Sequence, residues 1–242
     1  MKDNTDILNS YCRIRKLIGV LGMLLPVIIV IFYDELLPSI SHYYYTRSAV
    51  FFIAILAAFG FFLISYRGYE TKKVDNNKFC LRLSDNTVTH IGGIAILIVV
   101  LIPTDCIVNL SICAGCQSTE FCLFGHRDVV VGAIHLLSAA LFFIAMGYMS
   151  LCNFTRGNDN KYHIWYKLCG WIIFITLGLL IIEFGIWKWI KPDFQITPYD
   201  VYIMETIMVV AFAVSWLLKG RTIEYMGDAL NHLFKSKGKQ KS

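Results

Sequence analysis

The run that decides the fold is residues 129–151, VVVGAIHLLSAALFFIAMGYMSL, which contains no aspartate, glutamate, lysine or arginine. An α-helix rises 1.5 Å per residue, and roughly 20 apolar residues cross the hydrocarbon of a bilayer. These 23 residues are therefore long enough to span a membrane. The sequence predicts a transmembrane helix here, with His135 and Ser138 inside it.

Five further apolar runs have a comparable length, and they are residues 17–32, 48–66, 87–103, 168–190 and 201–218. The strictly apolar part of the third run is short, which suits a tilted or partly buried helix. Transmembrane strands have about 9–11 residues of alternating polarity, and these runs do not alternate. With 57% hydrophobic residues, 16% charged residues and a mean hydropathy of +0.59, the chain is predicted to be an all-α, polytopic bundle of six transmembrane helices.

Lysine and arginine lie mainly on one side of this predicted bundle. They gather in the N-terminal segment, in the connections after the second and fourth helices, and in the C-terminal tail. The other side carries Arg47, Arg127, Lys188 and Lys191. The positive-inside rule then puts both termini in the cytoplasm. We expect residues 1–220 to form the transmembrane domain and residues 221–242 a basic cytoplasmic tail; the net charge of +5 follows from this topology, so no nucleic-acid partner is expected.

Four of the eight cysteines fall in the predicted outer loop between the third and fourth helices, and they are Cys106, Cys113, Cys116 and Cys122. On an oxidising face we expect two disulfides, with three pairings open. A four-thiolate zinc site is the alternative, although a single CxxC motif is a weak zinc signal. In both arrangements the loop would be held over the ends of the helices.

Three ionisable residues lie at a similar depth inside the predicted spans. His135, Glu183 and Glu205 are five to seven residues from the outer ends of their helices, or roughly 8–10 Å deep. A charge at that depth is costly in lipid, so these groups should face the bundle interior and should have partners. Together with Asp128 they are the candidate catalytic residues.

The fourth predicted helix carries a polar stripe. Asp128, Gly132, His135, Ser138 and Ala139 recur at spacings of three and four, so they share one helix face. Small residues in that stripe allow a neighbouring helix to approach closely. The stripe is predicted to face inward.

Residues 39–47, SISHYYYTR, join the first two helices. Because Pro38 cannot continue a helix smoothly, this segment is predicted to turn across the outer surface. Tyr43 and Tyr44 are typical of an interfacial aromatic belt. The segment also carries Ser39, Ser41, His42, Tyr45 and Arg47. Hydroxyls beside an arginine suit a phosphate, sulfate or carboxylate ligand.

The predicted ligand-binding set joins this segment to the buried stripe, and it consists of Ser39, Ser41, His42, Tyr45, Arg47, His126, Arg127, Asp128, His135, Ser138, Glu183 and Glu205. The candidate metal ligands, with zinc as the possible cofactor, are His42, His126 and His135. The alternative is a purely structural network. In that case His135 would donate to a carbonyl group, and Glu183 would pair with Arg47 or Arg127.

Five motifs carry a family resemblance. They are LPSISHYYYTR, YRGYE, IHLLSAALFF, YKLCGWI and FAVSWLLKGR, which follow one another along nearly the whole chain. The chain resembles a family of uncharacterised six-helix bacterial membrane proteins, a domain of unknown function. The resemblance implies the architecture and a bacterial inner membrane, and it implies no activity. Members of that family usually carry a small residue where this chain has His42.

Three functional classes fit these residues. The first is a binder of an anionic lipid headgroup or a small anion in an outward-facing polar pocket. The second is a metal-dependent or acid/base hydrolase or transferase acting on lipid; it resembles ceramidase-like hydrolases in its residue types, but the HxxxH, HEXXH, GXSXG and Walker motifs are absent. The third is a proton- or cation-coupled transporter, for which the inner half offers mainly Thr176 and Ser215.

Overall fold

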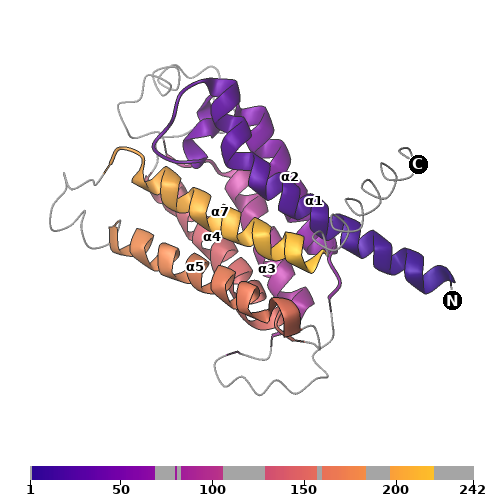
Figure 1. Cartoon of the computed structure of the whole chain (residues 1–242). Coiled ribbons are helices and arrows are strands. Elements are labelled where there is room, and N and C mark those ends of the chain that lie inside the picture. Colours follow the sequence, from indigo (N-terminus) through magenta and orange to yellow (C-terminus); the bar gives the residue numbers. More distant parts are fainter. Residues whose placement is uncertain are drawn as a thin grey trace, which may run out of the picture.

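A computed structural model describes residues 2–68, 80, 83–105, 129–156, 160–183 and 197–220. Within these ranges the chain is helical and contains no strand. The α-helices are α1 (Lys2–Tyr33), α2 (Ala49–Ser65), α3 (Asp85–Leu101), α4 (Val129–Tyr148), α5 (His163–Ile182) and α7 (Asp200–Lys219) (Figure 1). The short helical turns are η1 (Ser41–Tyr45), η3 (Met149–Asn153) and η4 (Asn160–Tyr162).

Four helical segments are long and apolar enough to cross a membrane, and they are Cys12–Tyr33, Val130–Asn153, His163–Ile182 and Asp200–Lys219. The helices α2 and α3 are also apolar, but each has 17 residues. The outer surface of the bundle is apolar as well: Val50 and Leu137 are 71% exposed and Ile164 is 79% exposed. Such side chains are stable facing lipid rather than water. The predicted all-α membrane fold is confirmed to this extent.

Two helices begin earlier than predicted. α1 includes the polar N-terminal segment, although the sequence predicted a start at residue 17, because hydropathy marks the membrane portion of a helix and not its full length. α5 begins at His163, five residues early, where Tyr166 packs its ring against Phe154 at 5.6 Å between centroids. The predicted last turns of the fifth helix lie outside the described residues.

The six α-helices form a closed ring. Each packs against the next along the chain, and α7 lies between α5 and α1, which closes the ring (Figure 1). In the interior, Phe212 contacts the rings of Phe59 and Phe142 at 5.5 and 5.7 Å between centroids. The helices α2 and α3 meet at Gly60 and Gly93, where a Cβ atom on either glycine would lie within 3.2 Å of the carbonyl oxygen of the other. This close contact depends on the missing side chains.

The segment between α1 and α2 turns across one end of the ring, as predicted, and this is the η1 end of the bundle. Tyr43 is fully buried and Tyr44 is 7% exposed, so the prediction of an interfacial belt is wrong for both. The Tyr43 hydroxyl donates to the carbonyl oxygen of Glu35 at 2.8 Å and accepts from the N–H of Leu37 at 3.2 Å. A buried phenol needs such partners, and here they fix the turn that follows α1.

Arg47 holds the end of α1. Its guanidinium donates to the carbonyl oxygens of Phe32 and Tyr33 in the last turn of that helix. The next residue, Asp34, has a φ of 69°, the left-handed conformation that often terminates helices. A cation at a helix C-terminus satisfies free carbonyl groups and interacts favourably with the helix dipole.

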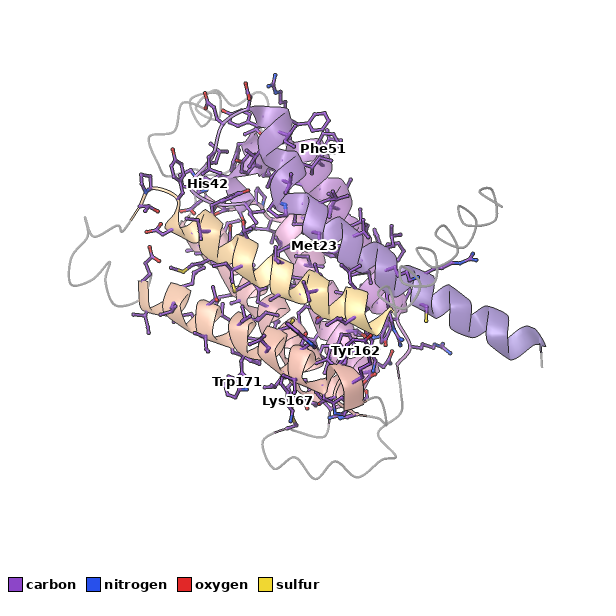
Figure 2. The ribbon with its side chains drawn as sticks, in the orientation of Figure 1. Met23, His42, Phe51, Tyr162, Lys167 and Trp171 are labelled. Carbon is purple, nitrogen blue, oxygen red and sulfur yellow. A yellow bond between two sulfur atoms is a disulfide. The ribbon has the colours of Figure 1, made fainter. Side chains whose placement is uncertain are left out.

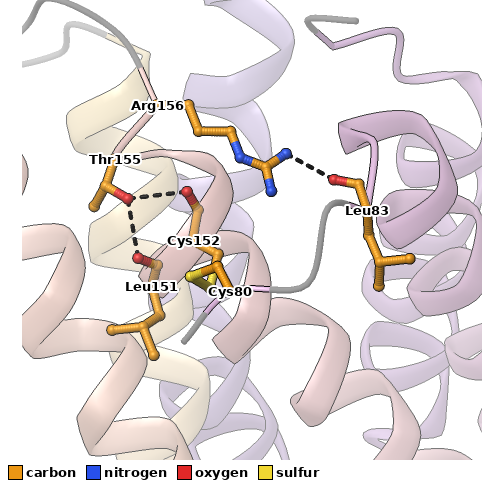
Figure 3. Close-up of a disulfide and its surroundings, with 6 residues drawn as sticks. All are labelled: Cys80, Leu83, Leu151, Cys152, Thr155 and Arg156. Atoms are coloured by element: carbon orange, nitrogen blue, oxygen red, sulfur yellow. Dashed lines mark hydrogen bonds between the residues drawn. A yellow bond between two sulfur atoms is a disulfide. The ribbon is translucent and has the colours of Figure 1, made fainter. Parts of the chain in front are cut away.

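At the opposite end, a disulfide joins Cys80 to Cys152, with 5.8 Å between their Cα atoms (Figure 3). It ties the connection between α2 and α3 to the turn η3. Nearby, Arg156 donates to the carbonyl oxygen of Leu83 at 2.7 Å, which links the same two regions a second time. This pair was not predicted from the sequence. The predicted disulfides of Cys106, Cys113, Cys116 and Cys122 lie outside the described residues.

Candidate functional site

A cavity of about 40 Å³ lies inside the bundle beneath η1. Its walls are apolar side chains from α1, α2, α3, α4 and α7, including Phe52, Val99 and Phe142. The polar residues in its lining are Ser41 and Glu205. The space would hold about three water molecules by volume, but apolar walls disfavour water and favour a short hydrocarbon segment.

Ser41 is hydrogen-bonded to His135. The Nε2 atom of His135 lies 3.0 Å from the Ser41 Oγ atom, and its Nδ1 atom lies 2.6 Å from the carbonyl oxygen of Ile102, at the end of α3. A carbonyl oxygen only accepts hydrogen bonds, so Nδ1 carries a proton, and in the neutral ring Nε2 accepts from the serine hydroxyl. His135 is 1% exposed. Ser41 is less buried, and it reaches the cavity.

Glu205 holds the residue next to Ser41. Its Oε2 atom accepts the backbone N–H of Ile40 at 2.6 Å. One turn from it on α7, the N–H of Tyr202 donates to the carbonyl oxygen of Pro38 at 2.9 Å. These two bonds fasten the approach to η1 against α7, so the position of Ser41 depends on Glu205.

His42 forms a second serine–histidine contact. Its Nδ1 atom lies 2.6 Å from the Ser39 Oγ atom, and its backbone N–H donates to the same oxygen at 3.3 Å. Figure 2 places His42 at the η1 end, far from Tyr162 and Lys167. Withdrawal from water lowers the pKa of His42 from its usual 6.5 to about 4, and nearby His135 lowers this pKa further while the Asp105 carboxylate opposes the shift. His42 is therefore neutral at pH 7.

This shift predicts acid sensitivity. Between pH 4 and 6.5 the unfolded chain binds a proton at His42 that the folded chain does not, so the free energy of unfolding rises with pH in this window and is constant, for this group, above it. We expect His42→Asn to flatten the dependence by on the order of 2–3 kcal/mol across the window. Thermal midpoints of both proteins at several pH values measure this; parallel profiles would contradict it.

The polar stripe on α4 faces inward, as predicted. Gly132, His135 and Ser138 are buried, and Ala139 lines the cavity. A Cβ atom on Gly132 would lie 2.8 Å from the Asp105 carboxyl carbon, so this glycine makes room for the acidic side chain. The stripe thus places His135 at the η1 end and, at Gly132, leaves space there for Asp105.

Glu183 does not line the cavity. It lies beside Asp200, within hydrogen-bonding reach, at the adjoining ends of α5 and α7. Among the described residues, neither Glu183 Oε2 nor Asp200 Oδ2 has a hydrogen-bond donor. Two carboxylates in contact repel each other unless they share a proton.

We therefore expect Glu183→Gln to leave the protein folded and to raise its free energy of unfolding by about 0.5–1.5 kcal/mol, because the amide can donate to Asp200 while one negative charge is removed. Thermal unfolding of the purified variant beside the wild type measures the change. A lower midpoint for the variant would show that the negative charge of Glu183 has a partner elsewhere.

The remaining predicted site residues are placed differently. Tyr45 donates from its hydroxyl to the carbonyl oxygen of Thr104, which fastens η1 to the end of α3. Arg47 is exposed and caps α1, so its described contacts are structural. The other members, His126, Arg127 and Asp128, lie outside the described residues. Within the described ranges, no group of three or more histidine, cysteine, aspartate or glutamate side chains could hold a metal ion.

Asp105 and the carbonyl group of Ile102 belong to the site but were not predicted from the sequence. Both follow α3 directly, on either side of Pro103 and Thr104. The proline was a signal that the helix ends there and leaves carbonyl groups without helical partners. No protein-family model, no curated protein and no solved structure matches the chain, so the family resemblance stays a prediction.

Proposed function

We propose that this chain is a multi-pass membrane protein that binds a lipid at the η1 end of its bundle, with an apolar chain in the cavity and the headgroup beside η1. The observation that supports this most is the lining of the cavity, where apolar walls from five helices surround Ser41 and Glu205. Ligand pockets commonly combine mostly apolar walls with a few placed polar groups.

The headgroup is proposed to be anionic, with its charge outside the cavity. Inside, the Glu205 carboxylate would repel an anion and would favour a hydroxyl or amide donor. Arg47 is exposed and lies two residues before α2, whose Phe52 lines the cavity, and its positive charge is proposed to attract the headgroup. The proposed lipid therefore has an anionic headgroup for Arg47 and, near the start of its acyl chain, a hydrogen-bond donor for Glu205.

All six α-helices are proposed to cross the inner membrane of a bacterium, with both termini in the cytoplasm and the η1 end outside. The distribution of lysine and arginine supports this orientation. The closed ring supports the number of spans, because α2 and α3 pack side by side and each also packs against a helix long enough to cross.

In this orientation the disulfide of Cys80 and Cys152 faces the cytoplasm, where thiols are kept reduced. We expect both cysteines to be thiols in growing cells and to pair after purification in air. After acid quenching, a thiol-reactive polymer should modify two more thiols in the protein from cells than in the purified protein, and Cys152→Ser should remove this difference. A disulfide already formed in quenched cells would contradict the orientation.

Filling the cavity tests the proposed binding. Ala139→Phe places a ring in the cavity, whereas Leu137→Phe, two residues earlier on α4, places the same ring on the outward face. Native mass spectrometry of the purified proteins should find bound lipid reduced at least about tenfold in the first variant, a loss of about 1.4 kcal/mol of binding, and unchanged in the second. Gel filtration checks folding, and Ala139→Leu is the milder replacement. Equal lipid content in all folded variants would overturn the proposal.

A further inference from the structure

Ser41 and His135 have the arrangement that an activated serine requires. The Ser41 hydroxyl donates to His135 Nε2 at 3.0 Å, and the Nδ1–H group on the other side of the ring donates to the carbonyl oxygen of Ile102. The carbonyl group fixes the ring orientation and the tautomer in which Nε2 is free to take a proton. Nucleophilic serines are activated by a base oriented in this way by a third group.

Ser41 and His135 also differ in exposure, in the way that a nucleophile and its base require. His135 is 1% exposed and is held between α3 and η1, whereas Ser41 lines the cavity. The other serine–histidine contact lacks this access, because Ser39 is 6% exposed and is absent from the cavity lining. Among the serines that the structure describes, Ser41 is the one that combines a histidine partner with a place in the cavity lining.

We propose that Ser41 is an acyl-accepting nucleophile and His135 its general base, acting on a carboxylic ester of a lipid whose acyl chain enters the cavity. This inference rests on the proposed lipid binding. Glu205 is a positioning residue in it, because it holds the N–H of Ile40 and thereby the start of η1.

The reaction needs only the lipid ester and an acceptor hydroxyl. Ser41 Oγ bonds to the ester carbonyl carbon as its proton passes to His135 Nε2; the bond from that carbon to the alcohol oxygen then breaks, and Nε2 returns the proton to the departing oxygen. Water or a second alcohol next attacks the acyl-serine, gives its proton to Nε2, and displaces Ser41 Oγ, which takes the proton back. Water yields a free fatty acid, and an alcohol yields a transferred acyl group.

An alkyl fluorophosphonate tests the nucleophile directly, since it phosphonylates activated serines and releases fluoride. With the full-length chain in lipid nanodiscs, we expect labelling on Ser41, mapped by peptide mass spectrometry, and no labelling of that peptide in Ser41→Ala. His135→Gln keeps a hydrogen-bond donor for Ile102 but has no base, so the labelling rate should fall at least about 100-fold. Ser65→Ala, at the exposed last residue of α2, should label at the wild-type rate.

The same samples separate this proposal from lipid binding. Ser41→Ala should retain bound lipid, because the cavity walls are unchanged. Wild-type protein that carries lipid but is not labelled would overturn the acyl-transfer proposal and leave the binding intact; protein without lipid would overturn the binding. If His135→Gln does not fold, the wild-type protein decides: labelling of Ser41 no faster than labelling of the exposed Ser65 would contradict an activated serine.

Discussion

Replacing Gly93 by leucine should eliminate most of the folded protein, whereas the same replacement at Gly178 should not. A Cβ atom on Gly93 would lie 2.8 Å from the carbonyl oxygen of Gly60 and 3.0 Å from the backbone nitrogen of Ile64. Backbone atoms cannot rotate away, so α2 and α3 would have to separate. Overpacking of a core side chain costs about 1–3 kcal/mol, and a clash with two backbone atoms should exceed this range.

The comparison with Gly178 isolates the packing effect. No described atom outside its own helix lies within 4 Å of a Cβ atom built on Gly178, so leucine there should project into open space. The yield of monodisperse protein in gel filtration and the thermal midpoint measure both variants. Equal yields from both would mean that α2 and α3 do not approach as closely as described, and the cavity that they help to enclose would be in doubt.

The second large effect is expected at Glu205. Glu205→Ala removes the acceptor of the Ile40 N–H, and an unpaired buried amide costs about 1–3 kcal/mol. The alanine also removes the proposed acceptor for a hydroxyl or amide donor of the lipid, so bound lipid should decrease together with the thermal midpoint. Glu205→Gln retains a carbonyl oxygen for Ile40 and should keep the fold. The idea fails if the alanine and glutamine variants unfold at the same temperature.

The helices and the inward face of α4 could be predicted from the sequence because both depend on local pattern. A long apolar run predicts a membrane helix wherever it occurs, and the spacing of Gly132, His135 and Ser138 places them on one face irrespective of the neighbours. The position of Glu205 in the second turn of α7 was also predictable, since the apolar run that predicted this helix begins at residue 201. None of these inferences requires knowledge of which helices are adjacent.

The partners were not predictable, because depth in the membrane does not specify rotation or neighbours. His135 meets Ser41 across 94 positions of the chain, and Glu205 meets Ile40 across 165. Glu183 lies at a similar predicted depth but contacts Asp200. Hydropathy alone could not separate these cases.

Two residues in the connection between α1 and α2 also have partners that could not be predicted from the sequence. Arg47 was predicted to bind an anion, and the sequence did not predict the hydrogen bonds that its guanidinium donates to the last turn of α1. Tyr43 was assigned to the membrane interface, yet it is buried because Glu35 and Leu37 supply partners for its hydroxyl. In both cases the partners lie within 15 residues, and the turn that brings them close is set by packing rather than by composition.

The most direct test of lipid binding is to find where a lipid chain lies. A phospholipid with a photoreactive diazirine near the end of an acyl chain should cross-link to cavity-lining residues such as Val99, Phe142 and Phe143, and Ala139→Phe should abolish these cross-links. Cross-links confined to outward-facing residues such as Val130 and Leu137, and unaffected by that substitution, would show that the lipid only surrounds the bundle.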